Sequence, residues 1–168
     1  MLNIRKSLIS TTVATGFAML TMLAVLPSPA LAYDEASTSA VNVDAQGVGL
    51  QGYDPVAYFT VKAPTAGNAG FKAQHDGVIY HFANQANLDK FNADPAQYAP
   101  QFGGFCAMGV ALDKKLNGDP QAWKVVDGKL YLNLNKEVQT KWLEDVPGNL
   151  TKANSQWSAI KDKAPKDL

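Results

Sequence analysis

The chain has 168 residues, with 15 Lys or Arg and 15 Asp or Glu, so its formal net charge is zero. A balanced charge of this kind gives no reason to expect nucleic acid or an anionic membrane as a partner. The single cysteine, Cys106, excludes an intramolecular disulfide and with it a disulfide-stabilised scaffold.

The first 32 residues have the pattern of a secretory signal peptide. Arg5 and Lys6 form a short positive region, and an uncharged, mainly apolar stretch follows from residue 8 to 26. The sequence Ala-Leu-Ala at 30–32 then supplies small residues where signal peptidase cuts. A retained membrane anchor is the alternative, but the stretch is near the lower length limit for a span and is diluted by hydroxyl residues. We expect cleavage before Tyr33, no membrane span afterwards, and export to the periplasm or the extracellular space.

Three parts are expected after the signal. Residues 33–46 are small and polar, which is typical of a flexible leader. Residues 47–160 are expected to form one domain, and residues 161–168 a polar tail. Without the signal, 13 lysines face 15 acidic residues, and the net charge becomes −2.

An internal repeat predicts the fold. Residues 76–84 and 127–135 share Asp, Gly, Tyr and Asn at a constant offset of 51. Asp-Gly between alternating apolar residues predicts a β-hairpin, and each final Asn is suited to cap a helix. Apolar residues at helical spacing between 150 and 160 predict one more helix. The predicted fold class is therefore α+β, with a small antiparallel sheet built from two ββα units and a C-terminal helix.

Several short motifs carry a family resemblance. They are Tyr53-Asp54-Pro55-Val56, Tyr80-His81-Phe82, Asp94-Pro95 and Gly103-Gly104-Phe105-Cys106-Ala107. Between about residues 48 and 157 the chain resembles the YHS-domain family, and in particular its exported bacterial branch. The resemblance implies a treble-clef-like fold and a connection with metals. The cysteine pair of the metal-binding relatives is absent from residues 82–87, so a multi-cysteine site is not expected here.

Four residues remain as candidate metal ligands: Cys106, His81, Met108 and His75. Thiolate, thioether and imidazole together suit copper or zinc. Strand alternation places His81 on the face whose counterpart in the second copy is Leu132, so that face is expected to point to the core. His81 is then either a hydrogen-bonded core histidine or a site residue, while His75 adjoins a hairpin tip.

The function hypotheses follow from these candidates. The first is a periplasmic module that binds copper, zinc or another soft metal. The alternative is a metal-free domain that binds a small ligand or a protein and has a structural cysteine, with Tyr80, Phe105 and Asp54 as candidate ligand-binding residues. A thiol-dependent enzyme is the weakest hypothesis, because no orienting residue or oxyanion site accompanies the thiol. A lone thiol also leaves a disulfide-linked homodimer open.

Overall fold

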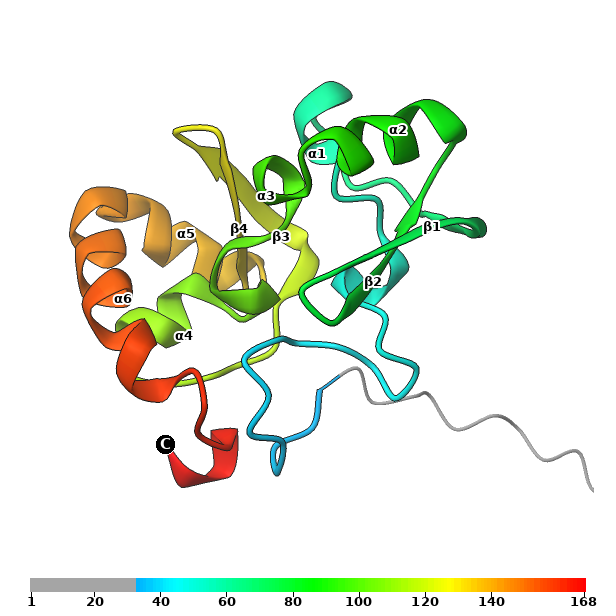
Figure 1. Ribbon diagram of the computed structural model, residues 1–168. Coiled ribbons are helices and arrows are strands. Elements are labelled where there is room, and N and C mark those ends of the chain that lie inside the picture. Colours follow the sequence, from blue (N-terminus) through cyan, green and yellow to red (C-terminus); the bar gives the residue numbers. More distant parts are fainter. Residues whose placement is uncertain (1–32) are drawn as a thin grey trace, which may run out of the picture.

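The computed structural model describes residues 33–168 (Figure 1), so the predicted signal peptide lies outside the described residues. The elements in chain order are η1 (Leu50–Gly52), α1 (Ala57–Thr60), β1 (Asn68–His75), β2 (Val78–Phe82), α2 (Gln85–Ala93), α3 (Pro95–Tyr98), η2 (Gln101–Gly104), α4 (Ala107–Ala111), β3 (Asp119–Val126), β4 (Lys129–Asn133), α5 (Lys136–Glu144), α6 (Val146–Ile160) and η3 (Pro165–Asp167), where η marks a 3-10 helix. Helices accompany two small antiparallel hairpins, which confirms the predicted α+β class and the C-terminal helix.

The two predicted ββα units are both present. β1, β2 and α2 form one unit, and β3, β4 and α5 form the other, with every boundary shifted by 51 residues. Each hairpin turns at an Asp-Gly pair, and all four turn residues have positive φ, as a type I′ turn requires. Asn84 and Asn135 cap α2 and α5, because each side chain accepts a hydrogen bond from the third backbone N–H that follows. These elements follow from local sequence.

The duplication also includes the chain before each hairpin. Leu50, Gln51 and Gly52 have φ of 51°, 51° and 79°, and residues 102–104 repeat this run of positive values with 53°, 61° and 85°. A short helix follows each run, α1 in the first case and α4 in the second. We therefore call residues 50–98 the first unit and residues 101–160 the second unit.

The sheet differs from the predicted one. The hairpins form two separate two-stranded sheets instead of one shared sheet. The outer edges of β2 and β4 each pair with a segment that precedes the hairpin, through the isolated bridges Val48–Ile79 and Cys106–Leu132. Those edges are therefore not free to pair with the other hairpin. The treble-clef description remains a prediction.

Strand β4 connects two hydrophobic clusters. Its Leu130 and Leu132 belong to the cluster of the first unit, and its Tyr131 belongs to the cluster formed with α4, α5 and α6. In Figure 1 the helices α4, α5 and α6 lie on one side of the β3–β4 hairpin, and the first unit lies on the other. β4 is consequently buried on both faces, whereas β2 buries only one.

The segments that flank the domain pack against it. Residues 33–46 were expected to form a flexible leader, and in the structure Asn42 N–H donates to Gly103 O at 2.9 Å. Val41 and Val43 pack against the first hydrophobic cluster. At the other end, Lys166 N–H donates to Glu35 O at 3.0 Å. Within residues 33–168, no helix has the length and hydropathy needed to cross a bilayer.

Candidate functional site

Cys106 lies at the start of α4 and is fully buried. Its Sγ accepts a hydrogen bond from Gly109 N–H at 3.2 Å and lies 3.9 Å from Asn133 Oδ1, to which the thiol donates. Burial raises the pKa of the Cys106 thiol, and the backbone N–H groups of Gly109, Leu134 and Met108 oppose that rise. A buried thiol with a raised pKa is neither exposed nor activated as a nucleophile.

Asp54 occupies the corresponding position in the first unit. It is also fully buried, and its Oδ1 accepts from Val56 N–H at 2.8 Å at the start of α1. Its Oδ2 accepts from Ala83 N–H at 2.8 Å and from Asn87 Nδ2 at 2.6 Å. The main-chain partners match as well, because Asp54 N–H donates to Thr65 O and Cys106 N–H donates to Leu116 O.

Asp54 and Cys106 therefore perform the same structural task in the two units. Each side chain collects backbone N–H groups from the start of a short helix and from the end of the second hairpin strand. This geometry accounts for a buried cysteine and a buried aspartate without a ligand.

His81 does not face the core of its unit, so the expectation taken from Leu132 was wrong on this point. Val78, Tyr80 and Phe82 form the buried face of β2, and His81 lies half-buried on the other face. The His81 side chain packs where Gly52 and Gly67 lack side chains of their own. A Cβ at Gly67 would lie 2.5 Å from His81 Cβ, and a Cβ at Gly52 would lie 3.5 Å from Nδ1.

The remaining candidates lie in different parts of the fold. His75 ends β1, half-buried, with its ring centroid 6.1 Å from that of Phe91. Tyr80 is buried against the same phenylalanine, and Phe105 is buried beside Tyr33. Met108 is half-buried in α4, so it does not share a strand face with Cys106. Within residues 33–168, no group of three or more His, Cys, Asp or Glu is arranged to hold a metal ion.

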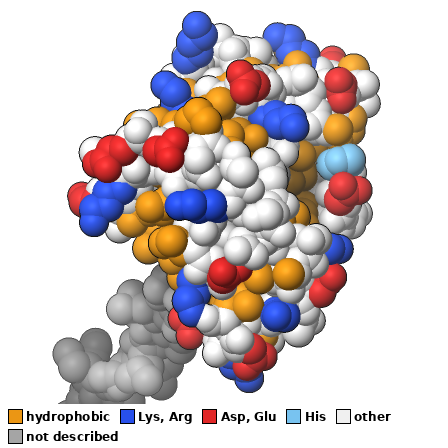
Figure 2. Space-filling view, turned by 90° about the vertical axis from the view of Figure 1, so that its left-hand side faces the viewer, with side chains coloured by type: hydrophobic (Ala, Val, Ile, Leu, Met, Phe, Trp, Pro, Cys, Tyr) orange, Lys and Arg blue, Asp and Glu red, His pale blue; other side chains and the backbone are white. Residues whose placement is uncertain are grey.

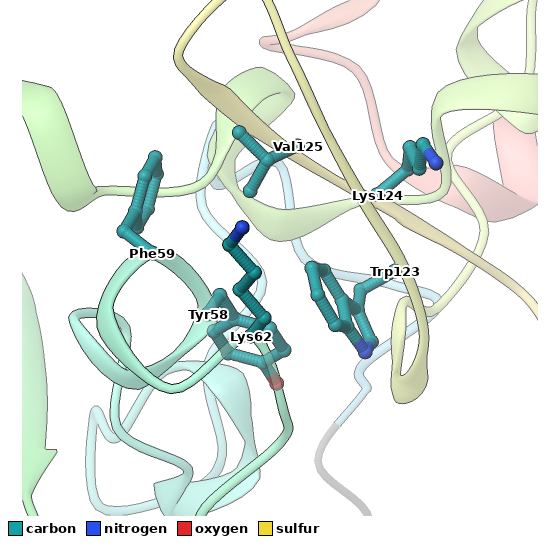
Figure 3. A pocket seen from close by; sticks show the side chains of 6 residues that line it. All are labelled: Tyr58, Phe59, Lys62, Trp123, Lys124 and Val125. Carbon is teal, nitrogen blue, oxygen red and sulfur yellow. The ribbon is translucent and has the colours of Figure 1, made fainter.

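The structure instead contains a cleft of about 390 Å³ between the two units. Its lining residues, which we call the aromatic cleft, are Tyr58, Phe59, Lys62, Trp123, Lys124 and Val125. The first three come from α1 and the residues after it, and the last three come from β3. Figure 3 shows Phe59 and Trp123 on opposite sides, with the Lys62 ammonium between them and Lys124 pointing away.

Aromatic contacts hold the walls of the cleft in place. The rings of Tyr58 and Trp123 meet edge to face with centroids 5.1 Å apart, and Phe59 meets Tyr98 in the same way at 5.3 Å. Tyr58 Oη donates to Pro120 O at 3.0 Å, which fixes the ring. Burial raises the pKa of Tyr58 far above its usual value, so the hydroxyl remains protonated.

Sequence reasoning did not identify the aromatic cleft. Tyr58, Phe59 and Trp123 were not among the candidate ligand-binding residues. Phe59 and Lys62 are close in the chain, but Lys62 follows α1 with a left-handed backbone, so no helical spacing in the sequence places them on one side of the cleft. Nothing in the sequence pairs these two residues with Trp123, which lies in the other unit.

The surface away from the cleft carries mixed charge. Figure 2 shows the face that includes α5 and α6, where Lys and Asp or Glu side chains alternate over the surface without a large region of one sign. Long-range electrostatics on that face therefore give no direction to a charged partner.

The fold and the cleft define an α+β domain of two related units with a cleft between them. Residues 55–102 match the family model of the YHS domain. This match confirms the resemblance to the YHS domain for that part of the chain. Neither the comparison with curated proteins nor the comparison with solved structures gave a match. The family match includes the α1 side of the aromatic cleft, whereas Trp123, Lys124 and Val125 lie beyond it.

Proposed function

We propose that this chain is an exported binding protein for a small aromatic ligand, which it holds in the aromatic cleft. The observation that carries this proposal is the pairing of Tyr58 and Phe59 from one unit with Trp123 from the other around a single cavity. Export rests on the signal-like sequence at residues 1–32, with the periplasm as the destination.

The cleft has the properties of a ligand site. A volume of about 390 Å³ lies in the range of small-molecule pockets, which are mainly apolar and contain a few polar groups. Because the walls already contact one another, a ligand would order few side chains on binding. The six lining residues include no carboxylate, imidazole or thiol, which favours binding over catalysis.

The experiment follows the indole N–H signal of Trp123 by NMR while one- and two-ring aromatic compounds are added, both neutral and charged. We expect a saturable shift of the Trp123 signal, assigned with Trp123→Phe. The signal of Trp142, which is fully buried elsewhere, should not move. In Val125→Phe the added ring should fill the cleft and remove the response. The proposal fails if no compound shifts the Trp123 signal up to millimolar concentration, or if Val125→Phe responds like the wild type.

Binding of copper or zinc by Cys106, His81, Met108 and His75 stays a prediction from the sequence. A metal ion bound to Cys106 Sγ would have to replace the hydrogen bonds that this sulfur accepts from backbone N–H groups. Titration with Cu(I) and Zn(II), comparing the wild type with Cys106→Ser and His81→Ala, tests it. Micromolar or tighter binding that both variants lose would support a metal site, and equal weak binding by all three would end the hypothesis.

A further inference from the structure

We infer that the ligand of the aromatic cleft is an aromatic carboxylate, with its ring against the aromatic side chains of the cleft and its carboxylate on the Lys62 ammonium. This inference rests on the proposed function and specifies the class of ligand. Two features carry it: the position of the Lys62 ammonium and the absence of an acidic partner.

Lys62 has a backbone conformation that does not suit a lysine. It follows α1, its N–H donates to Ala57 O at 3.0 Å, and its φ is 54°. Glycine or asparagine usually occupies this left-handed position after a helix, because a Cβ is strained there. Asp113 has the same left-handed backbone after α4, with a φ of 59°, so this conformation belongs to the end of both short helices and sets the direction in which the Lys62 side chain leaves the chain.

The ammonium of Lys62 lies within the cleft, between Phe59 and Trp123 (Figure 3). Aromatic faces attract cations, so a cleft of this kind without a lysine would suit a cationic ligand. The Lys62 charge occupies that place and repels a second cation. It attracts a carboxylate, with which it can form a charge-assisted hydrogen bond.

The Lys62 ammonium also has no acidic partner among the described residues. Within residues 33–168, its ammonium forms no ion pair, since the two ion pairs there are His75–Asp76 and Lys161–Asp162. Both charged residues that line the cleft are lysines. The Lys62 ammonium therefore gives the mouth of the cleft a local positive charge, which the carboxylate of a ligand would neutralise.

The test compares 2-naphthoate with 2-naphthamide, which share a ring system and differ in charge. The purified protein is titrated with each compound at low salt, and binding is followed through the Trp123 indole signal. We expect the carboxylate to bind about fivefold to tenfold more tightly than the amide, as a charge-assisted hydrogen bond would give. The preference should shrink as salt is added, because the cleft is open to solvent.

Variants assign that preference to one ammonium. Lys62→Met should abolish it, while the matched control Lys124→Met should keep it because Lys124 points away from the cleft. Lys62→Gly suits the left-handed backbone, so this variant should fold with a raised Tm and still lose the preference.

The outcomes separate the inference from the proposed function. Equal binding of naphthoate and naphthamide would overturn the inference and leave a neutral aromatic ligand for the cleft. A preference that survives in Lys62→Met and Lys62→Gly would also overturn it. Failure of both compounds to move the Trp123 signal would overturn the inference and count against the proposed function as well.

Discussion

At the scale of single residues, the two units solve one problem with different chemistry. A turn of left-handed residues precedes a short helix in each unit, and the backbone N–H groups at the helix start need an acceptor. Asp54 supplies a carboxylate in the first unit, and Cys106 supplies a thiol in the second. Cys106, a candidate metal ligand in the sequence, thus has a structural explanation. The motif around Cys106 does not by itself distinguish a structural role from a metal-binding one.

This explanation predicts a large effect of Asp54→Ala. The substitution leaves two buried N–H groups, one half-buried N–H group and the buried Asn87 amide without their acceptor. Each buried donor without a partner costs about 1–3 kcal/mol, so we expect the free energy of unfolding to fall by at least about 3 kcal/mol. Urea denaturation measures it. Asp162→Ala, at an exposed surface ion pair, should change little. Equal effects of the two substitutions would contradict the role of Asp54.

Tyr80 predicts a dependence of stability on alkaline pH. Burial, and to a smaller extent Asp76, raises the pKa of Tyr80 far above its usual value near 10. Above about pH 10 the tyrosines of the unfolded chain lose protons, while Tyr80 in the folded chain keeps its own. The folded state then binds more protons, so stability is complete below pH 10 and declines above it.

Tyr80→Phe tests this effect. The variant lacks the ionisable hydroxyl, so its urea midpoint should decline less steeply between pH 9 and pH 11 than that of the wild type. The decline should not disappear, because burial raises the pKa of Tyr58 and Tyr131 in the same direction. Parallel declines in the variant and the wild type would show that Tyr80 does not cause the effect.

At the scale of elements, the hairpin and its helix form the repeated piece. The Asp-Gly turns and the caps Asn84 and Asn135 are the same in both units, and their hydrogen bonds have nearly equal lengths of 3.0 and 2.9 Å. Short helices of nine residues gain much of their stability from such ends. The two caps should therefore contribute about equally to the free energy of unfolding, although the two units differ in sequence elsewhere.

Asn84→Ala and Asn135→Ala should each lower the free energy of unfolding by about 1 kcal/mol, the usual value of an N-cap. Chemical denaturation of the single variants measures this loss. Asn92→Ala is the matched control, because Asn92 is exposed inside α2 and alanine is the better helix former there. A loss confined to one cap would contradict the equivalence of the two units.

At the scale of the whole molecule, Lys115 joins both flanking segments to the domain. Its buried Nζ donates to Ser39 O at 2.7 Å, Lys161 O at 2.8 Å and Lys163 O at 2.7 Å, and it lies 4.8 Å from the Phe105 ring centroid. Burial lowers the pKa of Lys115, and three carbonyl acceptors compensate for that cost by using all three N–H groups of the ammonium.

Lys115→Met should separate the flanking segments from the domain. The methionine fills much of the space but leaves three carbonyl groups without their donor, so we expect a loss of at least about 3 kcal/mol. Hydrogen exchange should also become faster in residues 33–46 and 161–168. Lys114→Met, at the exposed neighbouring position, is the control. Unchanged exchange in both segments would contradict the role of Lys115.

The sequence by itself determined the features that depend on neighbouring residues. Asp-Gly pairs require positive φ whatever surrounds them, and a constant offset of 51 placed two hairpins and two caps correctly. The resemblance to the YHS domain likewise depends on short motifs, and the family match at residues 55–102 confirms it.

Only the tertiary structure decided which faces and which units meet. β4 is buried on both faces because α4 and α5 cover it, whereas β2 has no such cover, so Leu132 was a misleading guide to His81. The aromatic cleft joins α1 with β3 across more than 50 residues. Such contacts depend on how the elements pack around a shared core, and the spacing of residues along the chain does not show which distant elements meet.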